Sequence, residues 1–187
     1  MGDLGTGVYD AFSFLEKFSS DVSRLVTIVE EKLKNKRLIA LGDASTFWDL
    51  SRAFYAPGQW LPKYIIRHYT EDLEPEAKKQ WKARWLLFFV VYLYPDQFRQ
   101  PVAACGSIIQ YGAKNIWQIL KRAEVYTKDP QFLKIVPAKE WTNVEDLPDS
   151  LSTFKYRSTW LTDLKDANTV DSVVIEPLLQ EAKTLRS

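Results

Sequence analysis

The amino-acid sequence predicts an all-α protein, an irregular multi-helix bundle with a proline-punctuated C-terminal helical arm. Three observations lead to this expectation. Apolar residues recur at steps of three and four along the first 36 residues, prolines stand at the starts of later apolar segments, and no turn signal interrupts residues 75–94. All three patterns are typical of α-helices.

The first element is predicted as one long helix from Val8 to about Lys36. Its apolar residues form a continuous stripe along one helix face. They are Val8, Ala11, Phe12, Leu15, Phe18, Val22, Leu25, Val26, Val29 and Leu33. Charged residues occupy the opposite face, and a basic cluster at residues 32–37 complements the negative end of the helix dipole.

The middle of the chain is predicted to form four further helices. They cover about 45–55, 62–69, 75–94 and 101–126. The apolar run Trp85–Tyr94 is also rich in β-forming residues, so a strand is the alternative there. We expect helix, because no turn separates this run from the charged helix-forming residues before it. Phe88, Phe89 and Val91 are therefore expected in the centre of the core.

The character of the chain changes after residue 127. Pro130, Pro137 and Pro148 separate short apolar clusters, and two shorter helices are predicted at about 150–164 and 170–185. The expected organisation is a helical bundle over residues 1–126 and a C-terminal arm over 127–187. The arm either completes the bundle or docks on a partner, because each of its clusters buries too little to be stable alone.

Composition limits the class of protein. Hydrophobic residues make up 46% of the 187 residues, too many for a disordered chain. The single cysteine excludes an intramolecular disulfide scaffold, and the N-terminus lacks the features of a signal peptide, so we expect an intracellular location. The longest apolar run has ten residues, about half of a membrane span, which leaves only peripheral membrane contact open.

The chain contains few residues that could perform catalysis. His68 is the only histidine and Cys105 the only cysteine, so no His/Cys metal cluster can form. No phosphate-binding or dinucleotide fingerprint is present. We therefore expect no enzyme activity and no cofactor or metal, with His68 at the surface or partly buried and hydrogen-bonded, and Cys105 an inert buried thiol.

Two groups of residues are candidates for binding. The first is an aromatic-rich window from Phe47 to Tyr69 with cations interleaved, a mixture typical of protein interfaces. Its candidate partner-binding residues are Trp48, Arg52, Tyr55, Trp60, Lys63 and Arg67. The alternatives are that these rings form the core, or that they stack on bases of a single-stranded nucleic acid.

The second group is a basic stripe beside Trp81 and Trp85. Its candidate phosphate-contacting residues are Lys78, Lys82 and Arg84. On a helix Lys78 and Lys82 share one face, as phosphate binding would require. The alternative is an ordinary solvated face, offset by the acidic residues at 71–76.

These observations favour a non-catalytic helical interaction or scaffold subunit of a larger protein assembly, with protein partners. The formal net charge is only +1, lower than is usual for a protein that grips a phosphate backbone. The alternative is a helical nucleic-acid-associated protein, such as a small ribonucleoprotein subunit or a virus-type capsid or suppressor protein. An enzyme of unfamiliar type is the third class.

Overall fold

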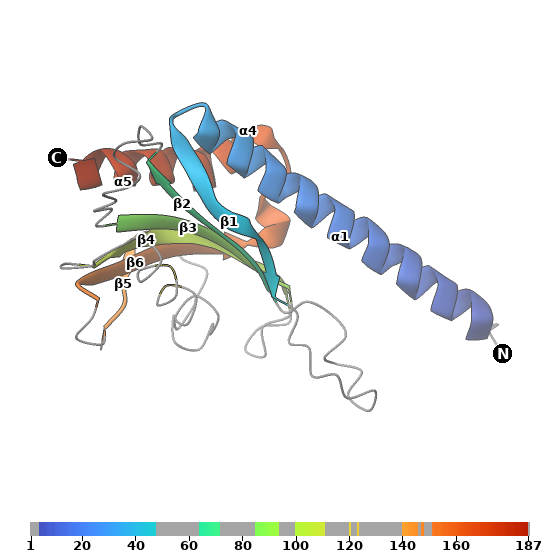
Figure 1. The fold of residues 1–187 in the computed structure, drawn as a ribbon. Helices are drawn as coiled ribbons and strands as arrows, with labels where there is room; N and C mark the ends of the chain where they lie inside the picture. The colour runs from blue at the N-terminus through green and yellow to red at the C-terminus, as the bar shows by residue number, and fades with distance from the viewer. Residues whose placement is uncertain are drawn as a thin grey trace.

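The computed structural model describes residues 4–47, 64–71, 85–93, 100–110, 120, 123, 140–145, 147 and 151–186, and its centre is a six-stranded antiparallel sheet (Figure 1). The strands are β1 (Leu38–Phe47), β2 (Tyr64–Glu71), β3 (Trp85–Tyr92), β4 (Val102–Ile109), β5 (Thr142–Asn143) and β6 (Thr153–Trp160). They follow the order β1-β2-β3-β4-β6-β5, so β3 and β4 lie in the middle.

Helices cover one face of this sheet. They are α1 (Leu4–Lys34), the 3-10 turn η2 (Leu161–Asp163), α4 (Ala167–Val170), the π-helical turn η3 (Asp171–Ile175) and α5 (Glu176–Arg186). Figure 1 shows α1 and α5 on the same side of the strands. The long N-terminal helix and a helix near the C-terminus were both expected from the sequence. Pro177 is the second residue of α5, which continues directly from the π-helical turn η3.

The all-α prediction is wrong, and β3 shows why. Every residue of β3 is buried, because the sheet lies between two layers of side chains. A central strand buried on both faces reads as a continuous apolar run without the alternation of a half-exposed strand. Periodicity cannot separate such a strand from a buried helix. The alternative of a strand at Trp85–Tyr94 was the correct one.

Four other predicted helices are corrected in the same way. The helix expected at 45–55 begins inside β1, and its remainder lies outside the described residues. The helices expected at 62–69, 101–126 and 150–164 overlap β2, β4 and β6, although Leu120 and Ala123 are helical. The small residues of β4 do allow a close approach, but to neighbouring strands. A Cβ at Gly106 would overlap the carbonyl oxygen of Lys155 and lie 2.6 Å from the Phe88 ring.

Side chains alternate between two hydrophobic cores, one on each face of the sheet. On one face Phe88 meets Phe154 edge-on, with ring centroids 5.4 Å apart, beside Leu120 and Leu151. On the other face Phe89 joins the side chains of α1 and α5. The predicted burial of Phe88, Phe89 and Val91 is confirmed, since all three are at most 1% exposed.

Ion pairs connect the helices to the sheet, and one helix to another. The Arg67 guanidinium on β2 donates to Glu30 of α1 at 2.6 Å. Lys32 of α1 donates to Asp171 of η3 at 2.6 Å, and Arg186 of α5 pairs with Glu71 of β2 at 2.7 Å. These pairs are partly exposed, so they define how the helices sit more than they contribute to the free energy of unfolding.

The last third of the chain is built into the sheet. β6 pairs with β4 along eight residue pairs, from Val102–Trp160 to Ile109–Thr153. Leu178 and Ala182 of α5 are buried in the same core as α1. The division into a bundle over 1–126 and an arm over 127–187 stays a prediction.

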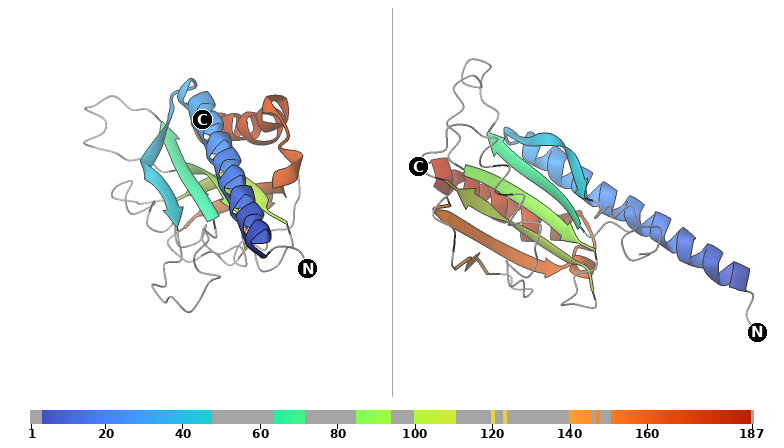
Figure 2. Two further views of the ribbon diagram at one scale, coloured as in Figure 1. Left: turned by 90° about the vertical axis from the view of Figure 1, so that its right-hand side faces the viewer. Right: turned by 60° about the horizontal axis from the view of Figure 1, so that its bottom comes forward.

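Helix α1 is longer than the sheet that it covers. Its 31 residues span about 46 Å, whereas a strand of eight residues spans about 26 Å. Val22, Val26, Val29 and Leu33 are buried against the sheet. Residues 5–14 are all exposed, and Figure 2 shows this end of the helix extending past the strands. We call residues 5–14 the free end of α1.

Candidate functional site

Most of the predicted binding residues lie outside the described part of the chain. These are Trp48, Arg52, Tyr55, Trp60 and Lys63 of the aromatic window, and Lys78, Lys82 and Arg84 of the basic stripe. Their assignment as partner-binding or phosphate-contacting residues therefore stays a prediction.

Arg67 is the one candidate that the structure places. It lies on β2, on the face that packs against α1, and its side chain is only 11% exposed. Its Nε and Nη2 atoms both donate to one carboxylate oxygen of Glu30, at 3.1 and 2.6 Å. The guanidinium is used inside the fold, where it joins α1 to the sheet, and offers little surface to a partner.

His68 is buried in the sheet on the opposite face, at register with Leu41 and Phe88. It is 2% exposed, and burial lowers its pKa to about 3. Within the described residues its Nε2 atom has no hydrogen-bond partner. The imidazole is therefore neutral at pH 7 and packed among apolar side chains, more deeply buried than the surface or partly buried histidine that we expected.

Cys105 lies in β4 beneath the C-terminal helices, buried as the sequence predicts. Burial raises the pKa of its thiol to about 12, an effect that the positive charge of Arg157 only partly opposes. A thiol with this pKa is protonated at pH 7, whereas the thiolate is the nucleophile. Cys105 thus has the properties of a core side chain.

A buried carboxylate joins α5 to the sheet. Glu181 is 4% exposed, accepts a hydrogen bond from the Ser107 hydroxyl at 2.8 Å and pairs with Lys155 at 2.6 Å. Ser107 and Lys155 are cross-strand partners on β4 and β6. A buried charge costs less when it is paired and hydrogen-bonded. The cluster specifies how α5 lies on the sheet.

An apolar groove lies where α1 leaves the sheet. Tyr92 of β3 pairs with Val102 of β4, which pairs with Trp160 of β6. The last residues of β3 and β6 and the first residue of β4 therefore lie side by side at one end of the strands. The residues just beyond them form one wall of the groove, held by a hydrogen bond from the Leu161 N–H to the Pro101 carbonyl at 3.0 Å. The wall consists of Leu93, Pro101, Leu161, Thr162 and Leu164.

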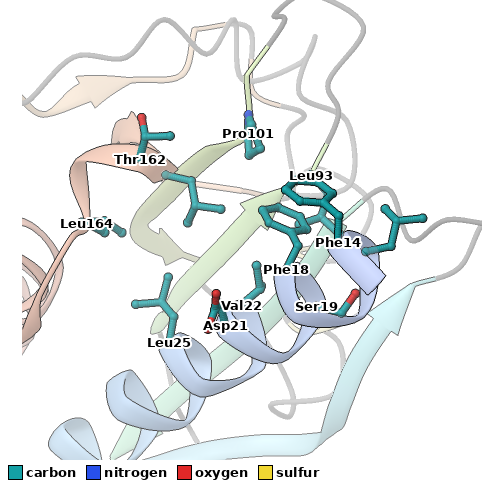
Figure 3. Close-up of a pocket in the computed structure, with 12 residues that line it drawn as sticks. Phe14, Phe18, Ser19, Asp21, Val22, Leu25, Leu93, Pro101, Thr162 and Leu164 are labelled. Carbon is teal, nitrogen blue, oxygen red and sulfur yellow. The ribbon is translucent and has the colours of Figure 1, made fainter. Parts of the chain in front are cut away.

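Helix α1 provides the opposite wall, over Phe14 to Leu25 (Figure 3). The rings of Phe14 and Phe18 stack with centroids 6.1 Å apart and planes 11° from parallel. The groove has a volume of about 660 Å³, within the range of ligand sites in proteins. Its lining is mostly apolar, with Ser19, Asp21 and Thr162 as the polar side chains.

Large apolar side chains continue from the groove along the free end of α1. Phe14 is 66% exposed, Phe12 68%, Tyr9 72% and Val8 51%. At about 100° per residue Val8 lies on the groove-facing side of α1, whereas Tyr9 lies on the opposite side. Exposed apolar residues are ordinary singly, but those continuous with an apolar groove indicate a binding surface. Among the described residues that line the groove, Asp21 is the only charged one.

The sequence contains a signal for this groove that periodicity alone does not reveal. The stripe from Val8 to Leu33 is uniform, and we expected one helix with one buried face. Its length is the missing signal, because a sheet of eight-residue strands covers only part of a helix this long. The far wall, including Pro101 and Leu161, becomes visible only once the strand order is known.

In the described part of the chain, no group of three or more His, Cys, Asp or Glu side chains is arranged to hold a metal ion. No described helix has the length and hydropathy that crossing a membrane would require. No protein-family model, curated protein or solved structure matches the chain.

Proposed function

We propose that this protein is a non-catalytic interaction subunit that binds a protein partner through the apolar groove and the free end of α1. The observation that carries the proposal is the 66% exposure of Phe14 beside the apolar groove, on a helix whose later residues Val22, Val26 and Val29 are buried against the sheet. Exposed apolar surface of this kind costs free energy in water unless a partner covers it.

The described side chains support binding rather than catalysis. His68 is neutral and enclosed, and the Cys105 thiol is protonated and enclosed, so neither is presented to a substrate. The buried carboxylate of Glu181 is occupied by Ser107 and Lys155. None of these three groups lines the groove.

Charge favours a protein over a nucleic acid or a lipid surface. Between residues 4 and 21, α1 carries Asp10, Glu16 and Asp21 against Lys17, an acidic excess. Phosphates require cations, and helices that bind anionic membranes carry Lys and Arg on their polar face. The groove region therefore gives no support to the nucleic-acid alternative. We further propose that the protein acts inside the cell, where its free cysteine stays reduced.

A position-specific photo-crosslinker tests this proposal. Benzoylphenylalanine is placed at Phe14, beside the groove, in cells that produce the protein. The matched control replaces Tyr9, which is equally exposed but lies on the opposite side of α1 at about 100° per residue. Irradiated products are separated by mass, and the crosslinked peptides are identified by mass spectrometry.

We expect one defined protein adduct from position 14 and none from position 9. Adducts of equal yield from both positions, or only lipid or nucleic-acid adducts from position 14, would contradict the proposal. A crosslink to a small molecule alone would reassign the groove as a ligand site.

A further inference from the structure

We infer that the partner in this groove is a second copy of the same chain. The free ends of two α1 helices cross antiparallel, and each lies in the groove of the other copy. This inference rests on the proposed function and specifies its partner. It follows from a match between two parts of one molecule, the protruding free end of α1 and the apolar groove.

The lengths of the two parts agree. The free end, residues 5–14, is about 15 Å long, and the α1 wall of the groove from Phe14 to Leu25 is about 17 Å long. Figure 2 shows the free end projecting away from the sheet, where it is accessible to another molecule. An antiparallel pair centred between Phe14 and Leu15 places residues 5–14 of each copy opposite 15–24 of the other.

Side-chain sizes are complementary in this register. Ala11 lies opposite Phe18 of the second copy, and Phe14 lies opposite Leu15 of the second copy. Ala11 is on the groove-facing side of α1, in line with Phe18, which follows it by seven residues or about two turns. A small residue facing a large one allows two helices to approach and fill the space between them.

Charges on the flank of the stripe are also complementary. Asp10 and Lys17 lie two turns apart on the same side of the groove-facing stripe. In the antiparallel pair like flanks meet, so Asp10 of one copy comes within two residues, about 3 Å along the axis, of Lys17 of the other. Two-fold symmetry repeats this contact, giving two ion pairs that favour this register.

A second copy covers more of the exposed apolar surface than an unrelated helix would. An unrelated helix in the groove would cover Phe14 and Phe18 and leave Val8 in water. In the two-fold pair, each copy buries both its groove and the groove-facing side of its free end, because the same contact is made twice. The chemistry of the partner is thus apolar, helical and weakly charged, as residues 5–14 are.

The oligomeric state of the purified full chain tests this inference. Light scattering during gel filtration is measured over a concentration series from about 1 to 100 μM. Phe14→Asp is compared with Tyr9→Asp, its control on the opposite side of α1. Asp10→Lys is compared with the double variant Asp10→Lys/Lys17→Asp, which restores opposite charges across the pair. Circular dichroism checks that each variant keeps the wild-type fold.

We expect a wild-type dimer whose dissociation constant rises at least about tenfold in Phe14→Asp and less than about twofold in Tyr9→Asp. Asp10→Lys should weaken the dimer, and the double variant should recover it. A monomer at every concentration, equal effects of the two aspartates, or no recovery by the double variant would overturn the inference. A monomer that still crosslinks from position 14 to a different protein removes the second copy and leaves the proposed function standing.

Discussion

At the scale of single residues, Gly106 is the position where two strands and a ring approach most closely. A methyl group there would overlap the Lys155 carbonyl of β6 and press on the Phe88 ring. The carbonyl belongs to the backbone and cannot rotate away, so we expect Gly106→Ala to lower the free energy of unfolding by about 1–3 kcal/mol or more. Urea denaturation measures this change.

Gly7→Ala is the matched control, because no atom lies within 4 Å of a Cβ at that position of α1. Alanine favours a helix over glycine by up to about 1 kcal/mol. A Gly106→Ala variant as stable as Gly7→Ala would mean that β4 and β6 are not packed as described.

His68 makes the stability of the fold depend on pH. Its pKa is about 3 in the folded protein and about 6.5 in the unfolded chain, so the unfolded chain binds the extra proton between these values. Its contribution to stability is fully present above pH 6.5 and falls as the pH drops toward 3, by up to about 1.4 kcal/mol per pH unit.

Replacing the imidazole with a group that does not titrate should remove this contribution. We expect His68→Gln to lose less stability than the wild type between pH 7 and pH 4.5, as measured by urea midpoints at several pH values. Parallel pH profiles for the two proteins would show that His68 is protonated without opening the sheet.

At the scale of elements, α1 divides into a part that stabilises the fold and a part that does not. Leu33 is fully buried against the sheet, whereas Phe12 is 68% exposed. We expect Leu33→Ala to cost about 2–5 kcal/mol, because it leaves a cavity in the core. Phe12→Ala should change the unfolding free energy of the monomer by less than about 0.5 kcal/mol. Thermal denaturation at concentrations where the protein is monomeric compares the two variants, and equal losses would contradict this division.

At the scale of the whole molecule, the two ends of the chain should differ in what they contribute to folding. A chain that stops near Asp129 lacks β6, which pairs with β4 over its whole length, and α5, whose Leu178 is buried. Without them β4 becomes an edge strand and the core opens, so we expect this chain to aggregate or fail to fold.

Deletion of residues 2–10 is the comparison, because residues 5–10 are all exposed. At concentrations where both proteins are monomeric, that chain should keep the wild-type circular dichroism spectrum and melt at a similar temperature. If the chain that stops near Asp129 folds as well as the one without residues 2–10, the last third of the molecule is an arm after all, as the prolines at 130, 137 and 148 suggested.

Local pattern was sufficient to determine several features of this protein. The helix α1, the helical C-terminus, the burial of Phe88 and Phe89 and the burial of Cys105 follow from apolar spacing and residue type. Residues three and four positions apart lie on the same face of a helix, so the spacing of apolar residues in the sequence is enough to predict a helix and its buried face.

Only the tertiary structure decided that residues 85–92 and 102–109 are strands. Their partners lie on other strands, and burial on both faces removes the alternation that would reveal a strand. The groove was decided at the same level, because it exists only where β3, β4 and β6 end beneath a helix that continues. Whether Phe14 lies in the core or in water depends on how far the sheet extends, and no local pattern in α1 encodes that length.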